Sequence, residues 1–244
     1  MRIRIREQNL EQDDLIRLLV QYQLLPQLAR EIILDQEITS LEEIEYNPED
    51  IQIAIQQFVK KLQLKSESQL QIWLQNNDLQ PEQLSAIATR PLKIEKLKQV
   101  RWGNNIEAYF MERKDQLDRM IYSLIRTQDA GIAQELYFRI LDDATAFAPL
   151  AGQYSQGAEA QTGGLVGPVE MSTPHPQITA VLKNAQPGAL KAPMKIGEWY
   201  VVLRLEEFLP AQLDELMRQR LINEQFEKWL KESVKNQLTI QYLE

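Results

Sequence analysis

The sequence predicts an α+β protein in which helical segments from both ends of the chain flank a mixed segment of the order β-α-α-β-α-β-β. Apolar residues recur at helical spacing through residues 9–114, the pattern becomes mixed over 117–208, and the helical period returns after Pro210. A closing helix this apolar has to bury one face, so we expect it to pack on the N-terminal helices. The predicted domains are residues 1–116 with 209–244, and an inserted domain of residues 117–208.

The N-terminal region combines one short strand with a series of helices. Residues 2–6 alternate Arg and Ile, which is typical of a half-buried strand, and residues 237–243 alternate similarly, so we expect the two ends to pair. Helix-start signals, a capping side chain or a proline in the first turn, then stand at Asn9, Asn47, Ser66 and Pro81. They predict five or six short helices.

The mixed segment supplies the sheet. Strand-like patterns cover residues 120–125, 165–169, 190–196 and 199–205, and helical patterns cover residues 128–141, 144–154 and 177–183. A loop rich in Gly, Ala and Gln occupies residues 156–167. Pro210 is expected to open the long closing helix, because proline is favoured in the first turn.

Charge and composition exclude several classes of function. The chain has 35 acidic and 27 basic residues, a formal charge of −8, which disfavours a nucleic-acid partner because phosphate backbones would be repelled. It contains no cysteine, so disulfides, thiolate metal sites and cysteine nucleophiles are ruled out. The single histidine, His175, has no companion ligands for a metal site, and we expect neither a metal nor a cofactor.

No window of the chain approaches the roughly 18 apolar residues that a membrane span needs. Residues 1–6 are basic, like the start of a signal peptide, but polar and acidic residues 7–14 follow where an apolar region should stand. The sequence therefore predicts no signal peptide, no membrane span and a cytoplasmic location.

Four short motifs follow one another at characteristic distances: FAPLA at residues 147–151, YS at 154–155, GGLVG at 163–167 and QPG at 186–188. Their order and spacing resemble those of the parvulin prolyl isomerases. With helices from both ends around them, the chain resembles the SurA- and PrsA-type foldases. The resemblance implies a helical chaperone domain around a PpiC-type rotamase domain that acts on Xaa-Pro bonds in unfolded or partly folded client proteins.

The resemblance also implies a polar floor, made in this family of two histidines, a cysteine or aspartate, and an acidic residue after the double glycine. These positions fall on Ser123, Tyr200, Gly157 and Leu165 of this chain. Ser123 and Tyr200 each carry a hydroxyl that donates and accepts, so they are the candidate catalytic pair. The alternative is that both are ordinary strand residues.

An apolar proline pocket is the other part of the predicted site. Ile178 and Leu182 of the short helix would form its wall, with Met171 or Pro174 at its mouth, although the same spacing is typical of core residues. Binding a twisted amide better than a planar one lowers the isomerisation barrier without acid or base. His175, the single histidine, is interpreted as a solvated loop side chain.

Three functions stay open at this point. The first is a peptidyl-prolyl cis-trans isomerase of weak catalytic strength, because the polar floor has been lost. The second is a non-catalytic holdase that binds clients through the helical domain and the apolar pocket, and the third is an assembly factor dedicated to one client. A dimer made by exchange of helical arms also stays open.

Overall fold

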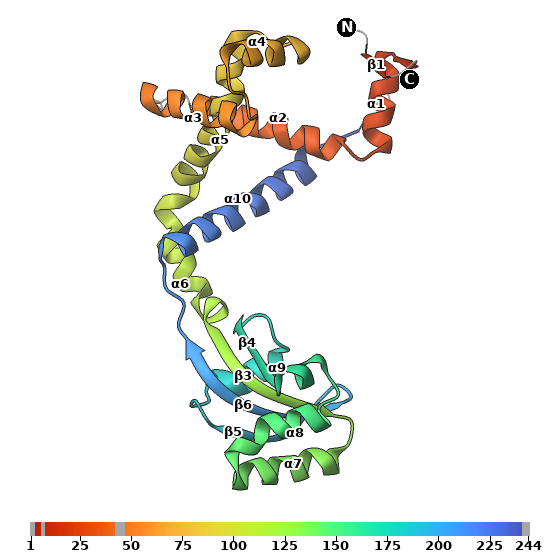
Figure 1. Cartoon of the computed structure of the whole chain (residues 1–244), viewed down its shortest axis with the longest axis vertical. Coiled ribbons are helices and arrows are strands. Elements are labelled where there is room, and N and C mark those ends of the chain that lie inside the picture. Colours follow the sequence, from red (N-terminus) through yellow and green to blue (C-terminus); the bar gives the residue numbers. More distant parts are fainter. Residues whose placement is uncertain (1–2, 6–7, 42–46, 241–244) are drawn as a thin grey trace. The chain divides into compact units, whose positions relative to one another are not determined.

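The computed structural model describes residues 3–5, 8–41 and 47–240, and its contacts divide the chain into two compact units (Figure 1). Residues 1–106 with 215–244 form the helical unit, and residues 107–214 form the sheet unit. The α+β fold class is confirmed. The boundaries 116/117 and 208/209 of separately folding domains stay a prediction.

The helical unit begins with β1 (Ile3–Ile5) and β2 (Gln8–Leu10), which pair antiparallel. Its helices are α1 (Gln12–Gln21), α2 (Leu25–Ser40), α3 (Pro48–Lys61), α4 (Glu67–Asn76), α5 (Pro81–Trp102) and α10 (Glu215–Gln237), with a 3-10 turn, η1, at Gly103–Asn105. The partner of β1 is thus β2, and the expected pairing with the far end is not seen in residues 238–240. Residues 241–243 lie outside the described residues.

Capping explains most of the helix starts. Asn47 Oδ1 accepts a hydrogen bond from Glu49 N at 3.1 Å, and Ser66 Oγ accepts one from Gln69 N at 3.3 Å. Pro48 and Pro81 occupy first turns, where no intrahelical N–H is needed. The start expected at Asn9 is wrong, because Asn9 belongs to β2 and Glu11 forms the capping box of α1.

The core of the helical unit joins segments from opposite ends of the sequence. Helix α10, blue in Figure 1, lies beside α2 and α5. The buried residues at their junction are Ile33, Leu34, Leu97, Phe226 and Leu230. The Trp102 ring packs at 6.0 Å from the Phe226 ring and 5.7 Å from the Trp229 ring. The apolar side chains of α10 around Phe226 and Leu230 are therefore buried on N-terminal helices, as the pattern predicts, whereas Leu216 on the expected apolar side is exposed.

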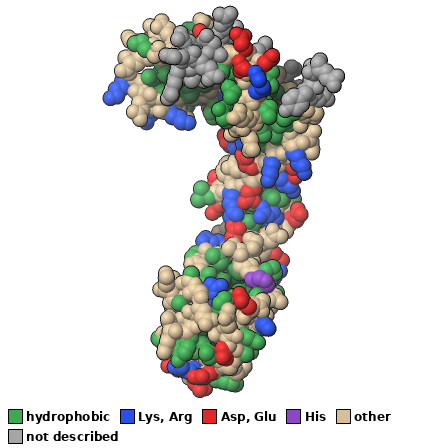
Figure 2. All heavy atoms as spheres, turned by 90° about the vertical axis from the view of Figure 1, so that its right-hand side faces the viewer, with side chains coloured by type: hydrophobic (Ala, Val, Ile, Leu, Met, Phe, Trp, Pro, Cys, Tyr) green, Lys and Arg blue, Asp and Glu red, His purple; other side chains and the backbone are tan. Residues whose placement is uncertain are grey.

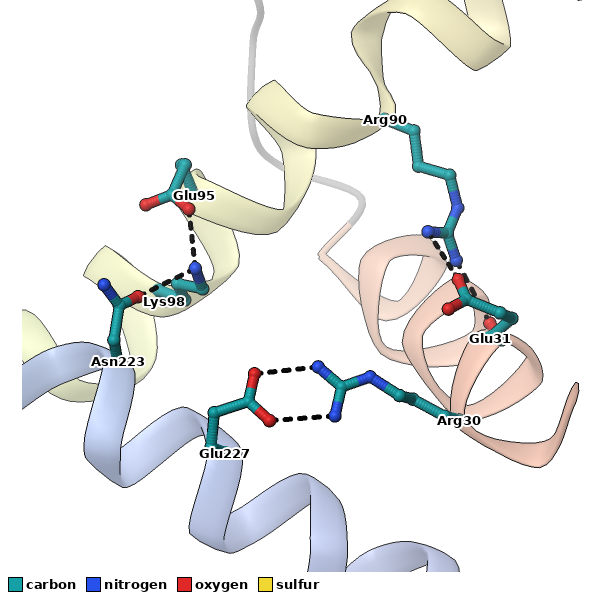
Figure 3. A network of polar contacts seen from close by, with 7 residues as sticks. All are labelled: Arg30, Glu31, Arg90, Glu95, Lys98, Asn223 and Glu227. Carbon is teal, nitrogen blue, oxygen red and sulfur yellow. Dashed lines mark hydrogen bonds and ion pairs between the residues drawn. The ribbon is translucent and has the colours of Figure 1, made fainter. Parts of the chain in front are cut away.

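A polar network surrounds this core (Figure 3). The Arg30 guanidinium donates two parallel hydrogen bonds to the Glu227 carboxylate, at 2.8 and 2.9 Å, and so links α2 to α10. Lys98 Nζ, on α5, donates to Glu95 Oε1 at 2.6 Å and to Asn223 Oδ1 at 2.9 Å. Because these side chains come from three helices, the network fixes how the helices align, while the apolar core supplies most of the stability.

The sheet unit contains a four-stranded antiparallel sheet of order β4-β3-β6-β5. Its strands are β3 (Arg119–Thr127), β4 (Leu165–Glu170), β5 (Leu190–Ile196) and β6 (Trp199–Leu209). The helices are α6 (Ile106–Leu117, from residue 107 in this unit), α7 (Ala130–Asp142), α8 (Phe147–Tyr154) and α9 (Pro176–Lys183), with 3-10 turns η2 (Ala144–Ala146) and η3 (Ala158–Thr162).

Side chains alternate across the sheet and divide the core of the sheet unit into two clusters. On the face covered by α9, which we call the α9 face, the buried residues include Met120, Tyr122, Leu124, Val201, Leu203 and Leu205 of β3 and β6. On the opposite face, the α7–α8 face, Ile125 and Val202 pack against residues of α7 and α8. The face on which a residue lies therefore decides which helix it meets.

Two expectations about the sheet unit need correction. Helix α10 begins at Glu215, not at Pro210, because residues 210–214 continue from β6 without helical structure and Ala211 N donates to Asp118 Oδ1 at 2.7 Å. The loop expected over residues 156–167 contains the 3-10 turn η3, whereas β4 begins at Leu165, where a strand over residues 165–169 is predicted. The glycines of residues 156–167 predict irregular structure, whereas the backbone there is largely hydrogen-bonded.

Among the described residues, no helix combines the length and apolar character needed to cross a lipid bilayer.

We expect Leu230→Ala to lower the free energy of unfolding by about 2–5 kcal/mol, because Leu230 is fully buried and truncation leaves a cavity. Leu216→Ala is a matched control on the same helix. The Leu216 side chain is 82% exposed, so its loss should change stability by less than about 0.5 kcal/mol. Urea unfolding followed by tryptophan fluorescence measures both, and equal losses would contradict this packing of α10.

Candidate active site

The α9 face gathers three of the residues that the sequence assigns to substrate binding. Met171, Ile178 and Leu182 are buried in one cluster with Tyr122 and Leu124 of β3. Helix α9 begins at Pro176 and is capped by His175, whose Nδ1 accepts from Gln177 N at 3.3 Å. The exposed side chain of His175 therefore has a capping role at the start of this helix.

The cluster reaches the surface at half-buried residues that pack around it. These are Val166, Val169, Ala185, Met194 and Trp199. The Met171 carbonyl accepts a hydrogen bond from Thr179 Oγ1 at 2.8 Å, which ties the loop before α9 to the helix itself. Met171, Ile178 and Leu182 are therefore core residues, and the accessible part of the cluster is its rim of half-buried side chains.

The two candidate catalytic hydroxyls lie apart from this cluster and from each other. Ser123 is opposite Arg204 in the β3–β6 register, and Tyr200 is opposite Thr127, four residues further along β3. At a rise of 3.3–3.4 Å per residue, the two are roughly 13 Å apart along the strands. The expected hydrogen bond between Ser123 and Tyr200 is therefore not formed.

Ser123 instead belongs to a polar group on the α7–α8 face. Its Oγ donates to Glu206 Oε1 at 2.5 Å, and the same oxygen accepts from Arg204 Nε at 2.7 Å. The Arg204 guanidinium lies over the Phe147 ring, at 4.9 Å from its centroid. Tyr200 is half-buried against the cluster on the same face.

The remaining two predicted positions have different surroundings. Leu165 lies in β4 opposite Ser123, and its side chain is 49% exposed. Gly157 lies just before η3, where any Cβ would overlap with Arg126 Nε and Glu159 Oε2. Gly157 therefore makes room for the side chain of Arg126.

Arg126 and Glu159 form an ion pair that sequence reasoning did not find. Arg126 Nη2 donates to Glu159 Oε2 at 2.9 Å; the arginine side chain is 35% exposed and that of the glutamate only 6%. The guanidinium also lies over the Trp199 ring, at 5.7 Å from its centroid, which is the geometry of a cation–π contact. A charged pair thus borders the apolar α9 face.

The chain after α8 positions this pair. Ser155 Oγ accepts from Arg126 N at 3.1 Å and donates to Glu159 Oε1 at 2.6 Å, while Gln156 N donates to the Arg126 carbonyl at 2.9 Å. Residues 155–156 thereby continue the hydrogen bonding of β3 beyond its pairing with β4. Both oxygens of the buried Glu159 carboxylate are used, which offsets the cost of burying a charge.

Tyr122 keeps its proton at this site. Burial raises the pKa of the Tyr122 phenol above its usual value, the negative charge of Glu159 raises it further, and Arg126 lowers it less than these two raise it. The phenol is therefore neutral and can donate a hydrogen bond. Tyr122 shares a buried cluster with Ile178 and Leu182, whereas Ser123 does not.

Two signals in the sequence could have revealed the missed residues. Glu159 is the single charged residue of the loop over residues 156–167, and Arg126 is a charged residue that directly follows the strand-like pattern over residues 120–125. Alternation along β3 also places Tyr122 and Leu124 on one face and Ser123 on the other. Within the described residues, no cluster of three or more His, Asp or Glu side chains could hold a metal ion.

We expect Gly157→Ala to destabilise the sheet unit by about 1–3 kcal/mol, because the added methyl group must displace Arg126 from its pair with Glu159. Gly152→Ala, in helix α8, is the matched control. A Cβ there meets only the Ala160 carbonyl at 3.7 Å, so this change should be neutral or stabilise by up to about 1 kcal/mol. Urea unfolding of both variants tests this, and no loss at Gly157 would mean that Arg126 moves freely.

Comparison with known proteins is consistent with this geometry. A family model described as "Rotamase: PPIC-type PPIASE domain" matches residues 125–207, which include all the predicted site residues except Ser123. A search of the curated proteins found no match to this chain.

Several solved structures resemble the chain. Peptidylprolyl isomerase PrsA from Bacillus cereus matches with a TM-score of 0.50 and 17% identity over 99% of this chain and 93% of that one. PrsA from Bacillus anthracis has a TM-score of 0.43 and 21% identity, covering 87% and 98%. The parvulin domain of PpiD from E. coli has a TM-score of 0.36 and 24% identity, covering 41% and 97%. At 17% identity and a TM-score of 0.50, the likeness to the Bacillus cereus structure shows a shared fold alone. By the family match, residues 125–207 of this chain are a rotamase domain of the PPIC type, the family of parvulin peptidyl-prolyl isomerases.

Proposed function

We propose that this protein is a foldase that isomerises Xaa-Pro bonds of client polypeptides with weak catalytic strength. The observation that carries the proposal is the PPIC-type domain at residues 125–207, whose α9 face is apolar. An apolar surface can hold a proline ring and remove water from the neighbouring carbonyl. Both effects favour a twisted amide over a planar one.

Weak catalysis is inferred from the groups on that face. The β3 residues that face α9 are Met120, Tyr122 and Leu124, and the one histidine of the chain caps α9 instead. The barrier to rotation is roughly 18–20 kcal/mol, and each 1.36 kcal/mol of preference for the twisted amide gives a tenfold acceleration. Losing the hydrogen bonds of a polar floor should therefore reduce the rate by one or more factors of ten.

We assign the proline-binding surface to Met171, Ile178 and Leu182, reached through the half-buried Trp199 and Met194. Gly157 contributes by admitting Arg126 to the edge of this surface. Substrate contact at Leu165 and catalytic roles for Ser123 and Tyr200 stay predictions. Both hydroxyls lie on the α7–α8 face, and this location disfavours direct contact with a proline bound under α9.

A specific observation also favours client holding by the helical unit. No residue of α3 is buried, although the helix carries apolar residues along much of its length. Two grooves flank it: one of about 790 Å³ beside α4, whose apolar lining includes Ile55 and Val59, and one of about 540 Å³ beside α5, with Ile53 and Phe58. Half-exposed apolar grooves of this size suit short apolar segments of an unfolded chain.

Charge supports polypeptide partners over nucleic acid. The formal charge is −8, and on the face seen in Figure 2 basic and acidic side chains are interspersed without a basic patch. Foldases with this rotamase domain act on client polypeptides. The cytoplasmic location and a dimer formed by arm exchange stay predictions.

The first experiment measures cis–trans exchange of Xaa-Pro peptides by NMR with a series of preceding residues. We expect the protein to accelerate exchange, and Ile178→Ala to lower kcat/KM about tenfold because a contact to the proline ring is lost. Ile132→Ala on α7, where the side chain is 37% exposed, is the control and should leave exchange unchanged. One-dimensional spectra confirm that each variant is folded.

Absence of any acceleration across the peptide series would rule out isomerase activity. Tyr200→Phe tests the catalytic role predicted for that hydroxyl. A fall in kcat/KM for this variant would support the role, and an unchanged value would reject it.

The second experiment tests client holding. We expect the full chain to suppress aggregation of a reduced, unfolded client, and Ile53→Asp to weaken that effect several-fold because it places a charge in the groove between α3 and α5. Ile72→Asp on α4 is the matched control, since Ile72 is 56% exposed against 50% for Ile53 and lines neither of the two grooves. Light scattering of the client gives the readout, and equal effects of both changes would contradict a binding groove.

A further inference from the structure

The guanidinium of Arg126 occupies the space beside position 157, where the resemblance predicts a thiol or a carboxylate. Position 157 carries no side chain, and Arg126 of β3 fills the space that a side chain at 157 would need. The arginine is held on one side by Glu159, at 2.9 Å, and on another by the Trp199 ring, at 5.7 Å from its centroid. Trp199 in turn packs against the cluster that contains Ile178 and Leu182.

One donor of this guanidinium is unused. Arg126 Nε is the buried side-chain nitrogen or oxygen that finds no hydrogen-bond partner among the described residues. Leaving such a group unpaired costs stability, so its surroundings are expected to compensate or to serve a purpose. Nε itself is buried beside Gly157, whereas the arginine side chain as a whole is 35% exposed, so a ligand would meet the terminal nitrogens of the guanidinium and not Nε.

The chemistry of prolyl isomerisation gives such a donor a use. In the planar amide the nitrogen lone pair is delocalised into the carbonyl, and it becomes localised on nitrogen as the bond rotates. A donor aimed at the prolyl nitrogen therefore stabilises the twisted amide and contributes little to the planar one. Arginine suits this task, since its guanidinium carries five donors and stays charged.

We infer that Arg126 is a catalytic residue of this rotamase domain, donating a hydrogen bond to the prolyl nitrogen of the twisted amide, and that Glu159 is the residue that positions it. No proton is transferred and no covalent bond is broken, because rotation about one amide bond completes the reaction. The inference rests on the proposed isomerase function and names the group that carries it. It also explains why position 157 is a glycine, since any side chain there would displace the guanidinium of Arg126.

The test measures kcat and KM for NMR-detected exchange of an Xaa-Pro peptide with the full chain. We expect Arg126→Met to lower kcat about ten- to hundredfold, the range for a lost hydrogen bond from a charged group, with KM changed less than about twofold. Arg126→Lys keeps the charge and should recover part of kcat. Arg119→Met changes an exposed arginine at the opposite end of β3 and should behave like the unchanged protein.

A second arm tests the coupling between positions 126 and 157. Gly157→Ser should lower kcat by itself because it displaces Arg126, whereas adding Gly157→Ser to Arg126→Met should cause no further loss. Losses that multiply in the double variant would overturn the inference. Glu159→Gln keeps the size of the side chain and should lower kcat less than Arg126→Met does.

The outcomes distinguish a failure of the proposed isomerase function from a failure of the role assigned to Arg126. If the unchanged protein gives no exchange, the proposed isomerase function fails, whatever the variants do. If it is active and Arg126→Met retains the same kcat, only the role of Arg126 is overturned. Should Arg126→Met fail to fold because Glu159 is left buried without its cation, the double variant Arg126→Met/Glu159→Gln removes that charge and decides the same question.

Discussion

The antiparallel pairing of β3 with β6 is the constraint on which the sheet unit depends. Successive side chains of a strand point to opposite faces, so the register that sets Ser123 against Arg204 also sends Tyr122 and Leu124 to the helix α9. A shift of one residue would exchange the two cores. Which side chains can meet a substrate under α9 is therefore decided by backbone pairing before any chemistry is considered.

The same register places Arg126 on the border of the α9 face, and three positions then become interdependent. Arg126 needs Glu159 as its counter-ion, and both need a residue without Cβ at position 157. A chain with a cysteine or an aspartate at 157 has no room for this arginine conformation. The glycine at position 157 and the ion pair thus depend on each other. We therefore expect the effects of substitutions at positions 126, 157 and 159 on stability and activity to be non-additive.

Most of the fold could be predicted because it depends on local pattern. The strand over residues 190–196 matches β5 at both ends, since alternation is interrupted on each side by glycine-containing turns. Helix starts at Asn47, Ser66 and Pro81 followed from capping chemistry. The helix start predicted at Pro210 was wrong because a tertiary hydrogen bond from Ala211 to Asp118 competes with helix formation there.

The contacts of the candidate site are harder to predict from the sequence than the fold, for two physical reasons. A motif carried over with an error of one residue leaves a strand in place but moves a side chain to the opposite face. Ser123 lies on the α7–α8 face, and its neighbour Tyr122 lies on the α9 face. The Arg126–Glu159 pair joins residues 33 positions apart, and no local pattern specifies such a contact. By contrast, Met171, Ile178 and Leu182 were found together because helical spacing and the neighbouring loop placed them on one side of the sheet.

The ion pair also bears on which clients such a site would accept. An unpaired guanidinium beside an apolar surface would attract acidic segments, and an unpaired carboxylate would attract basic ones. Glu159 offsets the charge of Arg126, so a client bound as proposed would meet a hydrogen-bond donor of a neutral pair, and selection among clients would depend on apolar contact. Apolar contacts separate similar side chains only weakly, by about 1–3 kcal/mol per methylene. A rotamase surface built in this way suits a protein that handles many unfolded chains better than one that selects a single charged motif.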